Sequence, residues 1–536
     1  MATKSIGKGA AVATLAIVCL VFFIDIANLG MANIALPTIQ KELGYDEGSL
    51  QWILTAYALT FGGFLMVGGR VGDIFGQRVT LIAGMTLFNA GTLLCALVND
   101  KIALVIGRAV QGIAAAFTIP AAQSMVSLSF EDAKSRIRAF GVWGASGSSG
   151  FVFGPIFGGL FTSLVTWRWI FWLSLVVEGS LEIVALVFLF TDNLPGAPTS
   201  APKDKNGRLK WSELATRLDP AGTCLSIVAL ILLVYGLTTG NVHGWGDADV
   251  VATLVVSVVL LAVFAFVQLK FSSDPILPRY LWSDRIKMLG CLMAALTYAI
   301  WQGSNYLLTL ELQSFGFSPL STALRFLPLG ITAMCVNFVI PIVIQRVQAR
   351  TLLLISWPVC AAGLALLTAM ADIGDYWRLC LPGEILYIAG VGTIYFVGNI
   401  KVVATAKAEQ QGTVSGVYNV SITSVACVPT YTDCIKMFLN IGGAVLGVAV
   451  LTVISDSVTS NQRDKDGPSA RLDGYRAGYY GTIAMAVIGS VASFFFYDEP
   501  VSKAEEELPV VQESVDSSRK MSREMKPECL AEDDLE

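Results

Sequence analysis

The sequence predicts an all-α polytopic membrane protein. Of its 536 residues, 54% are hydrophobic and only 14% are charged, and the mean hydropathy is +0.65. Soluble proteins carry about 25% charged residues. Uncharged runs such as residues 250–267 and 477–497 approach the length of about 20 residues that a helix needs to cross a bilayer.

Hydropathy predicts fourteen transmembrane helices along the chain. Their expected ranges are residues 11–36, 49–71, 79–98, 102–128, 139–163, 169–190, 220–240, 248–269, 286–311, 320–344, 350–371, 378–402, 413–454 and 477–497. With a cytoplasmic N-terminus, the cytoplasmic loops receive 20 Lys and Arg residues and the outer loops 8. Because positive loops stay in the cytoplasm, we expect both termini there.

The connecting segments predict how the chain is divided. A Pro-containing basic stretch separates the first six spans from the rest, and the acidic end is nearly free of aromatic residues, which is typical of disorder. The expected parts are a cytoplasmic N-terminus (1–10), a six-helix bundle (11–190), a cytoplasmic linker (191–219), two accessory helices (220–269), a second six-helix bundle (286–497) and a disordered cytoplasmic tail (498–536).

The composition argues against most enzymes. One histidine, His243, leaves no Ser-His-Asp or Cys-His triad and no His-rich metal site, and the sequence contains no phosphate-binding GxxxxGK[ST] loop. The ten cysteines are scattered singly, without the spacing of a disulfide framework or a zinc site. We therefore expect no enzymatic activity, no cofactor, no metal and no nucleic-acid partner.

Two glycine-containing patterns occur in the sequence, one between predicted spans and one inside a predicted span. Between the second and third spans, Gly69, Asp73, Gly76 and Arg78 lie in a short loop, where Asp73 can accept hydrogen bonds at a helix end and pair with an arginine. These charges alternatively serve only as a positive-inside anchor. In the fifth span, glycines leave one helix face bare for close packing, and a proline permits a kink: Gly141, Gly150, Gly154, Pro155, Gly158 and Gly159. Such faces also occur without any meaning for transport.

The chain resembles the fourteen-spanner drug:proton antiporter family of the major facilitator superfamily, in its fungal form. The loop resembles motif A of the superfamily, the Arg108–Gly112 stretch resembles motif B, and the fifth span resembles motif C, which marks antiporters. The resemblance covers residues 11–497. It implies the major facilitator fold and a monomer in the cell membrane, or alternatively the vacuolar membrane. It also implies export of a small molecule, a toxin, drug or secondary metabolite, in exchange for protons.

Arg108 is expected to have a polar or charged partner inside the protein, because inserting an arginine into a membrane costs about 2.5–3.5 kcal/mol on the insertion scale. Asp25 lies at a matching depth in the first span, and Asn28 shares its face one turn later. Members of the family usually place an acid at the position of Asn28. We expect Asp25 to bind the coupled proton near Arg108; the alternative is a structural polar pair.

Other polar residues inside predicted spans are further candidates. Glu178 and Glu182 share one helix face and suit proton coupling, although a packing role is equally compatible. By resemblance, spans 1, 4, 9 and 12 line the cavity. The expected substrate contacts are Asn28, Gln111, Gln302, Asn305, Tyr306, Glu384 and Tyr387, with Trp143, Trp301 and Tyr395 suited to a bulky, partly apolar substrate.

Residues 413–454 are too long for one span of about 20 residues. In the family that the chain resembles, only a short spacing separates an asparagine from a Gly-Gly-Ala sequence in this span. Here 22 residues separate Asn419 from Gly442. Omitting residues 420–436 restores that spacing, and codons compatible with an intron can encode the ends of the segment. We expect a retained intron; a genuine re-entrant insertion is the alternative, and sequencing of cDNA distinguishes them.

Two other functions remain open from the sequence. One is a carrier of basic amino acids, siderophores or borate-like solutes. The other is a membrane sensor or scaffold without transport, which the short polar tail of about 39 residues disfavours because a sensor usually carries a folded cytoplasmic domain.

Overall fold

A computed structural model describes residues 8–45, 50, 52–130, 132–190, 217–244, 246–270, 285–317, 319–407, 410–423, 451, 454–455, 457–459 and 468–496. Every regular element within these residues is a helix. Nine of the described helices are long and apolar enough to cross a membrane, and two shorter apolar helices accompany them.

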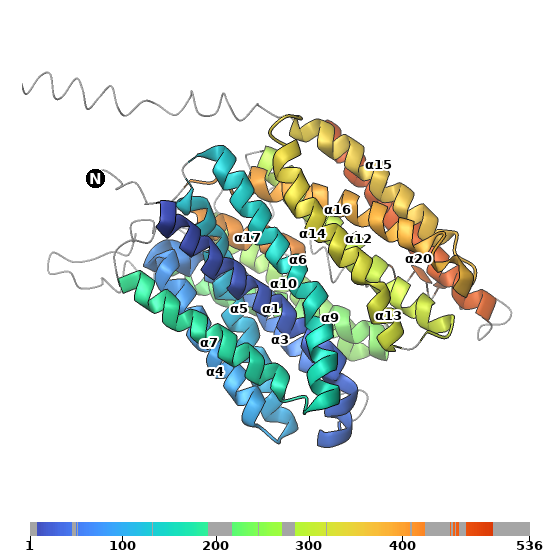
Figure 1. Cartoon of the computed structure of the whole chain (residues 1–536), viewed down its shortest axis with the longest axis horizontal. Helices are drawn as coiled ribbons and strands as arrows, with labels where there is room; N and C mark the ends of the chain where they lie inside the picture. Colours follow the sequence, from blue (N-terminus) through green and yellow to red (C-terminus); the bar gives the residue numbers. More distant parts are fainter. Residues whose placement is uncertain are drawn as a thin grey trace, which may run out of the picture. The chain divides into compact units, whose positions relative to one another are not determined.

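The first helices pack against one another in two groups. They are α1 (Lys8–Leu43), α3 (Trp52–Phe75), α4 (Gln77–Leu97), α5 (Lys101–Ser129), α6 (Ala133–Leu164) and α7 (Trp169–Phe190). Helix α1 runs along α6, whereas α5 packs against both α3 and α4 (Figure 1). We call these six helices the N-terminal half.

Local chemistry sets several of these helix ends. Gly76 adopts φ 98° between α3 and α4, a left-handed conformation that glycine accepts without strain. Asp100 accepts a hydrogen bond from Ala103 N at 3.0 Å, and Asp132 accepts one from Ser135 N at 2.8 Å. These carboxylates cap the starts of α5 and α6, where backbone N–H groups have no partner within the helix.

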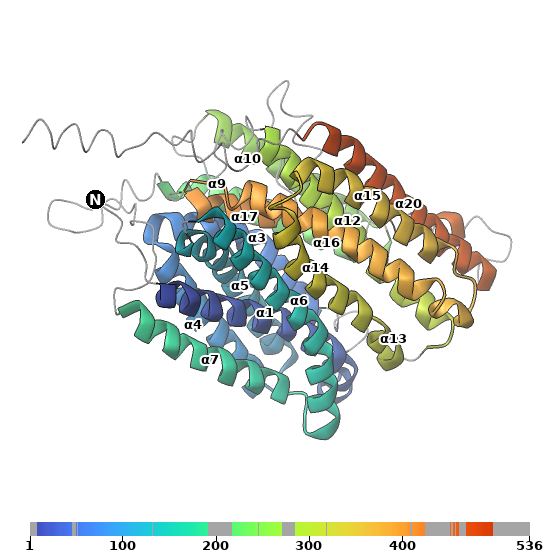
Figure 2. The same cartoon turned by 45° about the horizontal axis from the view of Figure 1, so that its top comes forward.

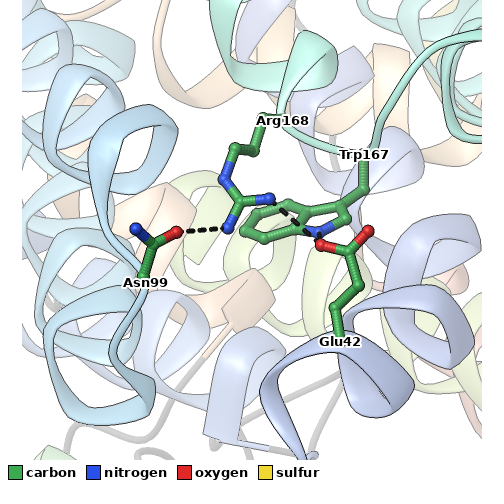
Figure 3. A network of polar contacts seen from close by, with 4 residues as sticks. All are labelled: Glu42, Asn99, Trp167 and Arg168. Atoms are coloured by element: carbon green, nitrogen blue, oxygen red, sulfur yellow. Dashed lines mark hydrogen bonds and ion pairs between the residues drawn. The ribbon is translucent and has the colours of Figure 1, made fainter.

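One end of the N-terminal half is braced by polar side chains from three connections (Figure 3). Arg168 contacts Glu42 Oε2 at 3.1 Å and donates to Asn99 Oδ1 at 2.6 Å, and its guanidinium lies 4.3 Å from the centre of the Trp167 ring. Trp167 Nε1 donates to the same Glu42 oxygen at 2.7 Å. The brace joins the end of α1, the α4–α5 turn and the α6–α7 turn.

Two helices form a hairpin against the N-terminal half. Helix α9 (Pro220–His243) packs on α10 (Ala248–Lys270) and on α3. Trp52 stacks on Tyr235 with ring centres 5.8 Å apart. Asp219, with φ 43°, caps α9 and also accepts a hydrogen bond from Gln268 near the end of α10, so one carboxylate fixes both ends of the hairpin.

The remaining helices form the C-terminal half. They are α12 (Arg285–Ser314), α13 (Pro319–Arg325), α14 (Leu327–Val343), α15 (Ala349–Thr368), the 3₁₀ turn η1 (Ile373–Tyr376), α16 (Cys380–Val402), α17 (Gln411–Thr423) and α20 (Pro468–Phe494). Helix α16 packs against α12, α14 and α15, and α20 packs against α12 and α15. Trp357 Nε1 donates to Ser493 Oγ at 2.9 Å, which joins α15 to α20.

Apart from shifts of up to nine residues at helix ends, the helices differ from the expected ranges in two places. The expected span 320–344 is two helices that break at Phe326, because Pro328 has no N–H to donate to the preceding turn. The expected segment 413–454 starts as α17, which ends at Thr423. Residues 424–436 lie outside the described residues, so the expected retained intron at 420–436 stays a prediction.

Candidate functional site

Asp73 joins the two halves at the end of α3. Its Oδ1 accepts a hydrogen bond from Gly412 N at 2.8 Å, and its Oδ2 accepts one from Thr413 N at 2.7 Å. Gln77 Nε2 donates to Oδ1 at 2.9 Å. The carboxylate therefore caps the N-terminus of α17, where backbone N–H groups and the helix dipole favour a negative charge.

The backbones of α3 and α17 touch beside this cap. A Cβ added to Gly69 would lie 2.2 Å from the Gly412 carbonyl oxygen, so this approach requires glycine. Gly76 forms the following turn, and Arg78 is half-buried at the start of α4. The residues of the loop pattern therefore lie at the contact of α3 with α17 or one turn from it: Gly69, Asp73, Gly76 and Arg78.

Side chains of α5 extend the contact with α17. Gln411 Nε2 donates to Ser127 Oγ at 2.6 Å, Asn419 Nδ2 donates to Gln123 Oε1 at 2.8 Å, and Ser415 Oγ donates to the same Gln123 oxygen. Together with Asp73 we call these residues the α17 latch: Asp73, Gln123, Ser127, Gln411, Ser415 and Asn419. The analysis of the sequence missed Gln123 and Ser127, although two polar side chains four residues apart in an apolar helix could have indicated them.

The glycine face of α6 lies against α1. A Cβ on Gly154 would lie 2.6 Å from Ala27 O, and one on Gly158 would lie 2.7 Å from Met31 Cα. Gly150 is equally tight against Phe23 O, whereas Gly159 has space, with Ile34 Cγ2 at 3.9 Å.

Pro155 and Gly141 contribute differently from these glycines. The Pro155 ring packs on Gly30 of α1, at 2.7 Å from the place of an added Cβ. Gly141 instead faces α14 of the other half, because its Cβ would lie 2.6 Å from Asn337 O. The glycine pattern thus makes close contacts both within one half and between the halves.

Arg108 is fully buried, and no carboxylate among the described residues pairs with it. Its NH1 donates to Asn28 Oδ1 at 2.5 Å and to Gln111 Oε1 at 2.8 Å, and its Nε donates to Ile53 O at 3.0 Å. The guanidinium also lies 4.9 Å from the centre of the Tyr57 ring, a cation–π distance. Uncharged oxygens and an aromatic face therefore hold this cation.

The expected pairing of Asp25 with Arg108 is wrong. Asp25 is also fully buried, but its carboxylate accepts a hydrogen bond from Thr118 Oγ1 at 3.2 Å, ten residues beyond Arg108 on α5. Ten residues span about 15 Å along a helix, which separates the two levels. Asn28, one turn along α1, takes the place beside Arg108.

Asp25 instead lies near Glu178 of α7, and the two carboxyl groups interact electrostatically. Glu178 is fully buried, and neither of its oxygens has a hydrogen-bond partner among the residues that the structure describes. Glu182, one turn further, is partly exposed and accepts hydrogen bonds from Thr86 Oγ1 and, at 2.7 Å, from Asn89 Nδ2. Three of the candidate acids thus follow the contact of α7 with α1 and α4.

An aromatic cavity lies between the halves, where α6 runs beside α14 (Figure 2). Helices α1, α6, α12, α14 and α16 contribute its walls. No charged side chain lines it in the described part of the chain, and its aromatic lining residues are Phe22, Trp143, Phe151, Tyr298, Trp301 and Tyr395. The Phe22 and Trp143 rings stack at 4.2 Å, and Asn337 Nδ2 donates to Ser148 Oγ at 3.1 Å across the halves.

The polar residues expected to contact the substrate do not line this cavity. Gln302 and Tyr306 are exposed on α12, Asn305 Oδ1 accepts a hydrogen bond from Tyr387 at 2.5 Å, and Glu384 is buried. Asn28 and Gln111 belong to the surroundings of Arg108. Tyr298 and Trp301 of α12 line the cavity, so the polar stripe of α12 points away from the cavity. The aromatic candidates Trp143, Trp301 and Tyr395 do line the cavity.

Comparisons with known proteins agree with this architecture. The family model of the Major Facilitator Superfamily matches residues 18–429. The puromycin resistance protein pur8 of Streptomyces alboniger is 32% identical over 89% of both chains. The efflux pump terJ of Aspergillus terreus is 25% identical over 90% of this chain and 88% of its own.

One further relative and one solved structure extend the comparison. The cephamycin export protein CmcT of Amycolatopsis lactamdurans is 29% identical over 71% of this chain and 73% of its own. The crystal structure of the human organic anion transporter MFSD10 covers 90% of this chain and 99% of its own, with a TM-score of 0.59 and 16% identity, which shows the shared fold. The chain belongs to the Major Facilitator Superfamily and is a multi-pass membrane transporter.

Proposed function

We propose that the protein exports uncharged, aromatic small organic molecules in exchange for protons. The aromatic cavity between the halves carries this proposal. Its walls come from both halves and offer flat rings together with the polar groups of Ser148 and Asn337. Aromatic rings bind one another through stacked or edge-on faces, and isolated polar groups orient a ligand.

The names of several relatives support export. Pur8, CmcT and terJ are named for puromycin resistance, cephamycin export and efflux, respectively. Basic amino acids are less compatible with this cavity, because its described lining contains no carboxylate to pair with a cation. We therefore favour a drug, toxin or metabolite over an amino acid, siderophore or borate-like solute.

Asp25 and Glu178 are the proposed carriers of the coupled proton. Both are fully buried, and within the described part of the chain neither makes a salt bridge and three of their carboxyl oxygens have no hydrogen bond. An unpaired buried charge is costly, so a bound proton stabilises this arrangement in the closed bundle. Glu182 is partly exposed and links Glu178 toward the surface of α7.

The α17 latch is the proposed gate at the end of the molecule that carries Asp73. We propose that the latch holds this end closed and that its release accompanies exchange between two access states. The positive loops favour a cytoplasmic position for this end, with both termini on the same side of the cell membrane. We further propose that the protein works as a monomer.

Proteoliposomes under an imposed pH gradient test the function. Radiolabelled chloramphenicol, an uncharged aromatic compound, serves as the probe, and tetraphenylphosphonium serves as an aromatic cation of comparable bulk. We expect transport of chloramphenicol against its gradient, dependent on the pH gradient, with little transport of tetraphenylphosphonium. Dissipation of the pH gradient with an ionophore should stop accumulation.

Two tryptophan substitutions locate the binding site. Trp301→Ala removes a cavity wall, whereas Trp377→Ala changes a tryptophan that is 75% exposed and remote from the cavity. Loss of an aromatic contact costs about 1 kcal/mol beyond its buried area, so the apparent KM should rise at least about 5-fold in Trp301→Ala only. An equal apparent KM in the unmodified protein, Trp301→Ala and Trp377→Ala would argue against this cavity as the substrate site.

A further inference from the structure

A second group of buried acids lies in the C-terminal half, apart from the cavity. Glu311 of α12 is 1% exposed and Glu384 of α16 is 0% exposed. Tyr479 of α20 donates to Glu311 Oε2 at 3.0 Å, and Cys380 Sγ lies 3.8 Å from Glu384 Oε1. We call Glu311, Cys380, Glu384 and Tyr479 the C-terminal carboxyl cluster.

Both carboxyl groups in this cluster have an unused oxygen. Glu311 Oε1 and Glu384 Oε2 are buried and accept no hydrogen bond from the described part of the chain. Cys380 contacts Glu384 and lies within electrostatic range of Glu311. Each buried carboxylate loses its hydration and keeps an unpaired oxygen, and binding a proton removes this cost.

The nearby arginines are engaged elsewhere. The Arg325 guanidinium lies 3.6 Å from the centre of the Phe317 ring and 4.9 Å from that of Tyr376, and its NH1 donates to Ser321 O at 3.0 Å. Arg476 NH1 contacts Asp473 at 3.4 Å, and its NH2 donates to Met370 O at 3.2 Å. Both exert an electrostatic effect on the cluster, but neither forms a salt bridge with either glutamate.

Two tyrosines beside the cluster form hydrogen bonds with other partners. Tyr387 donates to Asn305 Oδ1 at 2.5 Å, and Tyr376 donates to Arg325 O at 3.2 Å. Within the cluster itself, a tyrosine O–H and a thiol S–H point toward carboxyl oxygens. A hydroxyl and a thiol can donate to a carboxylate or accept from a carboxylic acid, so these partners suit either protonation state, whereas a metal ion would require further oxygen ligands.

We propose that the C-terminal carboxyl cluster is a second proton-binding site, occupied in this conformation and separate from Asp25 and Glu178. A carboxylate oxygen of Glu311 or Glu384 accepts one proton from water and returns it to water when the half rearranges. With the expected orientation, α12 ends and α16 begins at the outer side, so the cluster would load from outside. This inference rests on the proposed proton-driven export.

Infrared spectroscopy of the purified full-length protein in nanodiscs tests occupancy without a substrate. The C=O stretch of a carboxylic acid, identified by its shift in D₂O, reports protonated side chains near neutral pH. In an Asp25→Asn/Glu178→Gln background we expect this band to persist. Adding Glu311→Gln and Glu384→Gln should remove it, whereas adding Glu42→Gln, at a surface carboxylate, should leave it unchanged.

Either of two spectral results would overturn the inference. The band could be missing already in the Asp25→Asn/Glu178→Gln background, or it could survive both cluster substitutions. Glutamine keeps the size of glutamate and still accepts the Tyr479 hydrogen bond, and thermal unfolding in detergent checks that each variant is folded.

Proton counting gives a second readout that requires only single substitutions. Chloramphenicol flux and proton flux, the latter reported by pyranine trapped in proteoliposomes, give a stoichiometric ratio. We expect about two protons per chloramphenicol in the unmodified protein and in Glu42→Gln, one for each carboxyl site, and about one in Glu384→Gln.

The two proposals fail in different ways. A ratio of one in the unmodified protein would overturn the second site while leaving proton-driven export intact. Chloramphenicol export without any proton movement would refute the proposed coupling, and the infrared band would then still decide whether the cluster holds a proton.

Discussion

Arg108 is a fully buried cation whose partners are all uncharged. Its hydrogen bonds go to Asn28, Gln111 and the Ile53 carbonyl, and the Tyr57 ring lies against it. A permanent charge held by neutral dipoles keeps the same partners at every pH. In the proposed exchange the coupled proton would therefore bind elsewhere, and Asp25 and Glu178 are its proposed carriers.

We expect Asp25→Asn to abolish pH-driven export while the protein stays folded. The substitution removes the titrating oxygen but keeps the side chain's size and an oxygen that can accept from Thr118. Chloramphenicol uptake into proteoliposomes at a fixed pH gradient measures the effect. Asp249→Asn, at an exposed carboxylate of α10, is the control; a normal rate and pH dependence in Asp25→Asn would exclude Asp25 from coupling.

The sequence predicted that Arg108 is buried and needs a partner, but it indicated the wrong one. Hydropathy and residue spacing locate depth along a helix, and Asp25 and Asn28 differ by only one turn. Which of the two meets Arg108 depends on how α1 is seated against α5, and that follows from the glycine contacts of α6 with α1. Such packing distances are not encoded in a hydropathy pattern.

Two neighbouring glycines of α6 should respond oppositely to alanine. In Gly154→Ala the new methyl group would lie 2.6 Å from Ala27 O, a backbone atom that cannot move aside, whereas in Gly159→Ala its nearest neighbour is at 3.9 Å. Overpacking costs about 1–3 kcal/mol. The unfolding temperature and the transport rate should both fall in Gly154→Ala and stay near normal in Gly159→Ala. Equal unfolding temperatures and transport rates in the two variants would mean that α1 and α6 separate freely.

At the scale of helices, α17 depends on α3 and α5 for its first turns. Asp73 satisfies two backbone N–H groups at its start, and Gln123 and Ser127 bind its polar face. Helix α17 belongs to the C-terminal half in the chain but is capped by the N-terminal half. Any movement that separates the halves at this end must therefore leave the start of α17 uncapped or let water replace the carboxylate.

We expect Asp73→Ala to open this end more often. Loss of a helix cap costs about 1 kcal/mol, which corresponds to about a 5-fold change in an equilibrium. The alkylation rate of a Val414→Cys reporter, at a fully buried position of α17, measures the opening. Asp100→Ala removes a comparable cap from α5 without touching α17; equal alkylation in the two variants would contradict the latch.

The rotation of α12 shows a second limit of prediction from sequence. The polar stripe of Gln302, Asn305 and Tyr306 marks one face, and the aromatic pair Tyr298 and Trp301 marks the adjacent one. Polarity alone favours the first face for a cavity, but the structure turns the second toward it. An aromatic wall has the same hydropathy signal as a packing surface, so its role becomes visible only when opposing helices are in place.

At the scale of the molecule, the helical class and the superfamily could be predicted from the sequence. Low charge, long apolar runs and the three glycine-containing motifs are local signals, and the fold and the comparisons confirm them. The contacts between the halves could not be predicted. They join residues far apart in the sequence, such as Asp73 and Gly412, which are 339 positions apart, and no local pattern encodes that pairing.

The position of the latch along the chain bears on the unusual segment 420–436. Every residue that α17 contributes to the latch precedes residue 420, so a polypeptide without the segment keeps the whole latch. We expect a variant lacking residues 420–436 to show the same Val414→Cys alkylation rate as the full chain and at least equal transport. Faster alkylation in the shortened variant would show that the segment supports the closed gate.

If the shortened variant behaves as expected, a transcript that retains the segment and a transcript that lacks it would encode transporters with the same latch. Splicing could then keep or remove the segment without disturbing the part of α17 that forms the latch. The expected exon boundary falls directly after Asn419, the last latch residue of α17, so the exon structure would not affect the gate.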